Sequence, residues 1–191
     1  MDKQIKKQIH QLEKLLEDST LQATIELVIR TLTSSLSQNL PLLIFGNGGS
    51  AADAMHITGE LVRKFKKDRK SLNVICLNTN SVITSAWSND FNYESVFARQ
   101  VQAHGIPGGI CWGISTSGKS KSVLLGLEEA KKIGMITIGM TGSAGISISK
   151  YSDLLIAVPS DETPRIQELH LPIYHYICEE VEKNISAVKE I

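Results

Sequence analysis

The stretch that decides the fold is GNGGSAADAMHITGE, residues 46–60. The apolar run LLIF, residues 42–45, leads into its glycine-rich turn, and the residues after the turn predict a helix that carries Asp53, His56 and Glu60. A strand, a glycine loop and a helix in this order expose backbone N–H groups at the helix N-terminus, which suit an anion such as a phosphate. His56 and Glu60 are four residues apart and share one helix face. The stretch therefore predicts a phosphate site beside groups that can bind a metal or transfer a proton.

Outward from this stretch, apolar runs of strand length alternate with segments of helix length. The five runs lie at residues 42–45, 74–77, 109–114, 135–140 and 154–158. This alternation predicts an α/β fold with a five-stranded parallel sheet flanked by helices on both faces. In such sheets ligands bind beyond the carboxyl ends of the strands. The loops that follow the first four strands, which are rich in Ser, Thr, Asn and Gly, are therefore the candidate binding loops.

Two amphipathic helices are predicted before the first strand. Apolar residues recur there at helical spacing, in two sets: Ile5, Ile9, Leu12 and Leu16, then Leu21, Ile25, Val28 and Leu32. We expect residues 1–38 to form a helical hairpin. Such a hairpin either covers the sheet or packs against another subunit, and we favour subunit packing.

Composition excludes several classes of protein. A chain of 191 residues is long enough for one domain with a full hydrophobic core. Its 20 basic residues balance its 20 acidic ones, so no nucleic-acid or membrane partner is expected. The three cysteines, Cys76, Cys111 and Cys178, form no CxxC pair and are expected to be reduced core residues. The N-terminal residues lack the apolar segment of a signal peptide or membrane span, which favours a cytoplasmic protein.

Four hydroxyl side chains gather at the predicted end of the third strand: Ser115, Thr116, Ser117 and Ser120. A single one would be an ordinary helix cap, but four opposite a glycine loop favour a phosphate site. Residues 113–120, GISTSGKS, also fit the Walker A pattern of nucleotide hydrolases. Because Gly113 belongs to the predicted strand and the loop carries hydroxyls, we favour the nucleotide-hydrolase interpretation less.

The last helix is predicted from residue 163 onward, and its buried stripe consists of Ile166, Leu169, Ile173, Ile177 and Val181. Its polar candidates are Gln167, His170 and His175. Gln167 and His175 lie about 12 Å apart along an ideal helix and roughly 80° apart around it, so one metal could not easily take both from a straight helix of one chain. A bend at Pro172 or a subunit interface could bring them together.

Four motifs carry a resemblance to a known family: GNGGSAADAMHITGEL, SNDF, ISTSGKS and RIQELH. With them, the chain resembles the phosphoheptose isomerases of the sugar isomerase (SIS) fold over essentially its whole length. The resemblance implies a single SIS domain over residues 1–191 with a flavodoxin-like sheet. It also implies an aldose–ketose isomerase that converts sedoheptulose 7-phosphate to D-glycero-D-manno-heptose 7-phosphate through an enediolate, the first step of nucleotide-activated heptose biosynthesis.

The resemblance also implies functional residues. The substrate contacts would be Asn47, Gly48, Gly49, Glu60, Asn89, Asp90, Ser115, Thr116, Ser117, Ser120 and Gln167. The ligands of one zinc ion per subunit would be His56, Glu60, Gln167 and His175, although such mixed nitrogen and oxygen donors also suit other divalent metals. Moving a carbonyl between C2 and C1 of a sugar needs a base and an acid, and we assign these roles to Glu60 and His175. Members of the family form homotetramers with active sites at subunit interfaces.

Four positions depart from the pattern of the family: Lys64, Lys119, Pro164 and Pro172. None belongs to the proposed metal-binding set. The main alternative is a non-catalytic SIS protein that resembles the factor associated with the bacterial replication initiator. That branch lacks the histidine and glutamate that stand here as His175 and Glu60, so we favour the isomerase.

Overall fold

The computed structural model describes residues 1–187. Its centre is a five-stranded sheet in the order β2-β1-β3-β4-β5, and every neighbouring pair of strands is parallel. The strands are β1 (Leu42–Gly46), β2 (Val74–Cys76), β3 (Ile110–Ile114), β4 (Ile136–Gly142) and β5 (Leu154–Val158). The predicted α/β fold is confirmed. The order is the flavodoxin-like one, whose direction reverses between β1 and β3, and ligands bind at such a switch point.

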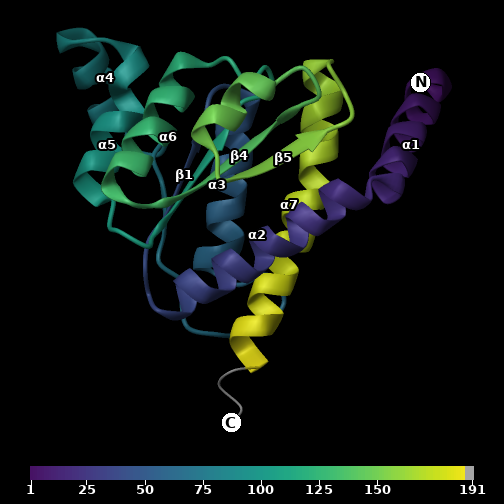
Figure 1. Ribbon diagram of the computed structural model, residues 1–191, viewed down its shortest axis with the longest axis horizontal. Coiled ribbons are helices and arrows are strands. Elements are labelled where there is room, and N and C mark those ends of the chain that lie inside the picture. The colour runs from purple at the N-terminus through teal and green to yellow at the C-terminus, as the bar shows by residue number, and fades with distance from the viewer. Residues whose placement is uncertain (188–191) are drawn as a thin grey trace.

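Helices cover both faces of the sheet (Figure 1). They are α1 (Asp2–Glu17), α2 (Ser19–Ser37), α3 (Gly49–Val62), α4 (Ser81–Asp90), α5 (Val96–His104), α6 (Lys121–Ile133) and α7 (Thr163–Ala187), with short 3-10 turns η1 (Tyr93–Ser95) and η2 (Ile146–Tyr151). No helix of residues 1–187 is long and apolar enough to cross a membrane.

The two cores follow from the alternation of side chains along the strands. Leu42 and Ile44 of β1 point to the face covered by α2, α3 and α7. Leu43 and Phe45 point to the opposite face, which α5 and α6 cover. Both faces of the sheet are buried under helices, which explains why this strand is apolar throughout. The predicted stripe of α7 is buried as expected, and α7 continues through Pro172 without interruption.

The two predicted N-terminal helices are present, but only α2 lies on the sheet. They meet at Asp18, whose carboxylate accepts a hydrogen bond from the Leu21 N–H at 2.8 Å and so starts α2. From this point α1 extends away from the sheet (Figure 1). Its apolar Ile5, Ile9 and Leu16 are 46%, 51% and 77% exposed. The apolar stripe predicted for α1 is therefore left largely uncovered within one chain.

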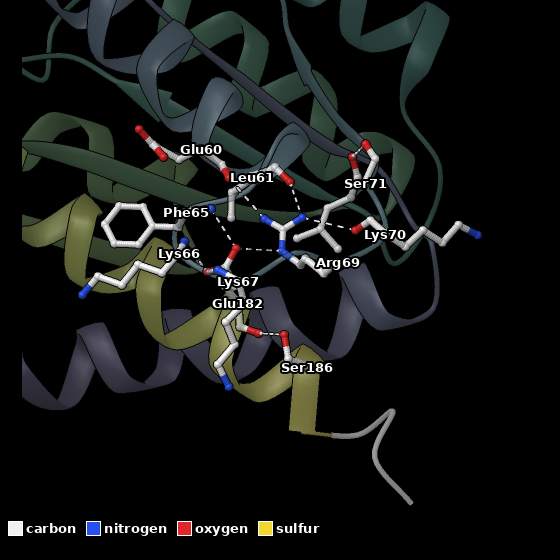
Figure 2. Close-up of polar contacts among 11 residues, drawn as sticks. Glu60, Leu61, Phe65, Lys66, Lys67, Arg69, Lys70, Ser71, Glu182 and Ser186 are labelled. Carbon is white, nitrogen blue, oxygen red and sulfur yellow. Dashed lines mark hydrogen bonds and ion pairs between the residues drawn. The ribbon is translucent and has the colours of Figure 1, made fainter.

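One buried carboxylate, Glu182 of α7, holds the loop that follows α3 (Figure 2). Its Oε1 accepts a hydrogen bond from the Phe65 N–H at 2.7 Å, and its Oε2 accepts from the N–H groups of Lys66 and Lys67 at 2.6 and 2.8 Å. Arg69 Nε lies 3.2 Å from Oε1. This contact is an ion pair without hydrogen-bond alignment, because Nε has no hydrogen-bond partner. We call Glu182, Arg69 and residues 65–67 the Glu182 hub.

The hub also fixes the end of α3. The Arg69 guanidinium donates hydrogen bonds to the carbonyl oxygens of Leu61 at 2.9 Å and of Glu60 at 3.2 Å. The last carbonyls of a helix have no partner within the helix, so the guanidinium acts as a cap. Figure 2 shows the Glu60 carboxylate pointing away from this cap. The backbone of Glu60 is thus held from one side, while its side chain points to the other side (Figure 2).

Candidate functional site

The first half of the site is a small polar cavity at the carboxyl ends of β1 and β3. Gly46 at the end of β1 pairs with Ile114 at the end of β3, so the loops that follow them start side by side. A cavity of about 150 Å³ lies between these loops and is lined by Asn47, Ser50, Ile114, Ser115, Thr116, Ser117 and Ser120. The two loops predicted to bind phosphate therefore do meet, at the switch point of the sheet.

The side-chain amide of Asn47 connects the residues around this cavity by hydrogen bonds. Its Nδ2 donates hydrogen bonds to the hydroxyl oxygens of Ser120 at 2.6 Å and Ser122 at 3.0 Å. The Tyr93 hydroxyl donates to Asn47 Oδ1 and fixes the orientation of the amide. Ser120 precedes α6 but makes no side-chain cap bond, so it leaves the first N–H groups of α6 available for an anion. Sequence analysis missed Tyr93, since nothing in its neighbourhood marks it as a partner of Asn47.

The glycines of the first loop are required by the backbone. Gly48 has φ of 55°, a left-handed conformation that favours glycine, and it precedes α3. A Cβ on Gly49 would lie 2.2 Å from Nε2 of Gln167, so the glycine lets this amide of α7 lie against the start of α3, and a larger residue would displace the amide. Gln167 therefore belongs to the same site as the glycine loop, within one chain.

The second half of the site joins α3 to α7. Nε2 of His56 lies 3.4 Å from Nε2 of His175 and 3.3 Å from Oε1 of Glu60. The side chains of His56 and Glu60 are 43% and 26% exposed, so solvent reaches the space in front of these two side chains and His175, which we call the cleft. Burial, followed by the neighbouring His56, lowers the pKa of His175, which favours the neutral ring. The structure thus brings together three side chains that the sequence predicts as metal ligands or proton-transfer groups, all from one chain.

Two of the distances in this cluster can be compared with those of a metal site. In a tetrahedral site with metal–ligand distances of about 2.0–2.1 Å, two ligand atoms stand about 3.3 Å apart. The two separations from His56 Nε2 are close to this edge length. No group of three or more His, Cys, Asp or Glu side chains in residues 1–187 converges as these side chains now stand. A cation would therefore need Gln167, or a small rotation of Glu60 or His175, to complete its shell.

A second pair of polar side chains stands behind His56. The Tyr174 hydroxyl lies 3.1 Å from His56 Nδ1 and donates to Asp53 Oδ1 at 3.4 Å. Burial raises the pKa of Asp53 to about 6, while the Tyr174 hydrogen bond and the nearby His56 act in the opposite direction. Burial also raises the pKa of Tyr174, which keeps the phenol protonated. Sequence analysis missed Tyr174, because a tyrosine on an apolar helix stripe is typical of a core residue.

Three candidates lie away from these contacts. Asn89 and Asp90 end α4, where both are exposed and the Asn89 amide donates to the Asp90 carboxylate at 3.0 Å. They do not line the Asn47 cavity of their own chain, and their role as substrate contacts stays a prediction. His170 is fully buried, with Nε2 3.3 Å from the Thr141 carbonyl oxygen, and burial lowers its pKa to about 4. His170 is therefore a packed residue and no part of the cleft.

The Walker A interpretation does not fit the backbone. Gly113 lies inside β3, paired with Phe45 and Gly139, so the strand already includes the first residue of the motif. Lys119 is exposed, and its N–H donates to the Ser117 hydroxyl oxygen at 3.3 Å. The loop that remains after β3 is short and is lined by hydroxyls. It therefore does not support the nucleotide-hydrolase interpretation.

Comparison with known proteins gives a consistent result. The family model of the SIS domain matches residues 5–142. The phosphoheptose isomerase of Crocosphaera subtropica is 53% identical over 146 residues, which are 76% of this chain and 74% of the relative. That of Synechocystis sp. is 44% identical over 191 residues, 100% of this chain and 98% of the relative. A solved structure of a phosphoheptose isomerase from Francisella tularensis has a TM-score of 0.89 and 30% identity, covering 95% of this chain and 96% of that one.

Proposed function

This chain belongs to the SIS-domain family and, within it, to the phosphoheptose isomerases, and we propose that it interconverts sedoheptulose 7-phosphate and D-glycero-D-manno-heptose 7-phosphate. It is a sugar-phosphate isomerase, as the four motifs predict. The observation that carries the proposal is that α3 links the two halves of the site: it begins at the glycine loop beside the Asn47 cavity and carries His56 and Glu60 further along the same helix, opposite His175 of α7. An anionic group and a carbonyl of one substrate could then be held together.

The cavity would bind the phosphate. The hydroxyls of Ser115, Thr116, Ser117 and Ser120 and the first N–H groups of α6 supply the donors, whereas the N–H groups of Ser50 and Ala51 in α3 already donate to the carbonyl oxygens of Asn47 and Gly48. Gly48 and Gly49 let the backbone approach the ligand. No lysine or arginine lines this cavity, so the phosphate would be recognised by neutral donors and helix termini rather than by an ion pair.

The chemistry is a proton transfer between adjacent carbons. A base removes a proton from C1 of the ketose, the electron pair forms the C1–C2 double bond of an enediolate, and a proton added at C2 leaves the aldehyde at C1. The proton of the C1 hydroxyl moves to the C2 oxygen, so no oxidant or reductant is consumed. We assign Glu60 as the base and His175 as the acid, because both side chains face the open cleft from neighbouring helices.

We propose that His56, Glu60, Gln167 and His175 hold zinc or another divalent cation, one per subunit. The two ligand separations at His56 and the mixed donor set of two imidazole nitrogens, one carboxylate and one amide oxygen support this assignment. A bound cation would polarise the carbonyl and offset the negative charge of the enediolate. The residues of the chain still have to orient the sugar and move its protons.

We also propose a homotetramer with active sites at subunit interfaces, in which the single domain packs through residues 1–38. The exposed apolar residues of α1 support this, as does an apolar groove of about 500 Å³ between α1, α2 and α7. An interface could also bring the exposed Asn89 and Asp90 to the site of a neighbour. A cytoplasmic location and the absence of nucleic-acid or membrane partners stay part of this proposal.

The test is an isomerase assay on the purified protein with and without a chelator. Glu60→Gln should reduce turnover by a factor of 10² or more, on the order expected for loss of a general base, while the fold stays intact. Glu17→Gln, an exposed glutamate of α1, is the matched control. Normal turnover in Glu60→Gln would exclude Glu60 as the base, and full activity in a metal-free sample would exclude the cation.

A further inference from the structure

Behind His56 lies a buried hydroxyl that the isomerase chemistry does not use. Tyr174 is 1% exposed and comes from α7, whereas Asp53 and His56 come from α3. We propose that Tyr174 is a positioning residue whose hydroxyl, held by Asp53, fixes the tautomer and orientation of the His56 ring. This inference rests on the proposed function, because it concerns how His56 is prepared to bind a cation.

The direction of the hydrogen bonds follows from what each group can donate. As a carboxylate, Asp53 only accepts, so the single hydroxyl proton of Tyr174 goes to Asp53 Oδ1, 3.4 Å away. The Tyr174 oxygen then faces His56 Nδ1 at 3.1 Å with lone pairs only, and Nδ1 must carry the proton of the neutral ring.

The reverse arrangement is disfavoured. If the Tyr174 hydroxyl donated to His56 Nδ1, Asp53 Oδ1 would lose this donor. Asp53 Oδ2 is already buried without a hydrogen-bond partner among residues 1–187. The carboxylate would then lack a side-chain donor at both oxygens, and a buried acceptor without a partner is costly.

With the proton on Nδ1, the lone pair of His56 Nε2 points into the cleft. That nitrogen is the atom that faces both His175 Nε2 and Glu60 Oε1. Histidine ligands of metals commonly donate their other N–H to an oxygen that orients the ring, and loss of such a partner typically weakens metal binding by about 10–100-fold. Here the oxygen is a phenol, which is in turn held by a carboxylate.

A packing role for Tyr174 predicts a different result. The Tyr174 ring packs edge-on against the rings of His56 and His175, with centroids 5.5 and 5.0 Å away. If packing were its whole role, phenylalanine would replace it without effect on His56. Tyr174→Phe removes only the hydroxyl and therefore separates the two roles.

The experiment measures Zn²⁺ affinity of the metal-free, full-length protein by competition with a chromophoric chelator. Tyr174→Phe should raise the dissociation constant for Zn²⁺ by about 10–100-fold. Tyr151→Phe is the control, since it removes the hydroxyl of a tyrosine that packs against the core on the opposite face of the sheet, and it should leave the affinity unchanged. An unchanged affinity in Tyr174→Phe would overturn the proposal.

A second readout needs neither metal nor substrate. Long-range ¹H–¹⁵N correlation spectra of the metal-free protein report which nitrogen of each histidine carries the proton. His56 should be protonated at Nδ1 in the wild type and should shift toward the Nε2–H form in Tyr174→Phe. The Nε2–H form in the wild type would contradict the inference. If the wild type neither bound Zn²⁺ nor isomerised the sugar phosphate, the proposed function would fail, and these spectra would still decide the role of Tyr174.

Discussion

α7 meets α3 and the loop after it at two polar clusters, the Glu182 hub and the cluster of His56, Glu60 and His175. His175 and Glu182 are seven residues apart, two turns of one helix, so the clusters share a helix face. In the hub, three N–H donors and a guanidinium surround one carboxylate. In the other cluster, nitrogen and oxygen atoms of three partly exposed side chains, all able to bind a cation, face one another. The first arrangement stabilises the fold, whereas the second holds groups ready for a ligand.

The difference predicts that the hub carries the larger share of stability. Glu182→Ala would leave the buried Arg69 without its partner and free three N–H groups, and breaking such a pair costs about 3–5 kcal/mol. The melting temperature should fall by roughly 6–20 °C for a chain of this length. Thermal unfolding followed by circular dichroism measures the change.

The neighbouring Glu179→Ala is the matched control for the hub. Glu179 pairs with Lys66 on the surface, where the side chains are 42% and 62% exposed, and exposed pairs contribute about 0–1 kcal/mol. If Glu179→Ala and Glu182→Ala lowered the melting temperature equally, burial would not be what distinguishes the hub.

The cluster of His56, Glu60 and His175 should be stabilised by a bound cation, whereas the Glu182 hub should not. A ligand that binds only the folded state adds about 2.7 kcal/mol when its concentration is 100 times its dissociation constant. Zn²⁺ should therefore raise the melting temperature of the wild type by roughly 5–10 °C. In His56→Ala the increase should disappear, because His56 Nε2 stands between the other two groups. Equal increases in both proteins would place the metal elsewhere.

Acid should weaken the hub at a defined pH. Burial alone would raise the pKa of Glu182, but the N–H groups of residues 65–67 and the charge of Arg69 outweigh it and lower the pKa below the ordinary 4.5. A lowered folded-state pKa means that the unfolded state binds the proton more readily, so this stabilisation is complete above pH 4.5 and is lost as the pH falls through the lowered value. Urea unfolding across this range should show the difference in stability between wild type and Glu182→Gln shrinking. A constant difference would contradict the assignment.

The two clusters also differ in how much of them the sequence reveals. The pairing of His56 and Glu60 was predicted, because residues four positions apart on one helix share a face. The strands and the α7 stripe were predicted because burial on two faces, or on one stripe, leaves a periodic pattern. His175 was one of three polar candidates of the last helix, and its place beside His56 was predicted only through the family resemblance, because only tertiary packing brings the two together.

Other parts could not be predicted from local pattern. Glu182 resembles an ordinary surface glutamate of a charged helix end, and its partners are mostly backbone N–H groups, which leave no trace in side-chain identity. Tyr174 resembles a core residue because it lies on the apolar stripe of α7, and only the packing of α7 against α3 brings its hydroxyl to Asp53 and His56. The exposure of the α1 stripe depends on the direction in which the chain leaves Asp18, and helical periodicity does not encode that direction.

The smallest expected change in stability is that of His175→Ala. His175→Ala removes a partly exposed ring that makes one long contact with His56, 3.4 Å between the two Nε2 atoms, and that packs against the rings of Phe65 and Tyr174. These contacts are weak, so the free energy of unfolding without metal should change by about 1 kcal/mol or less, even though isomerase activity is lost. Urea unfolding and the isomerase assay on the same sample measure both. A loss of stability as large as that in Glu182→Ala would mean that both clusters stabilise the fold and that the contrast between them is wrong.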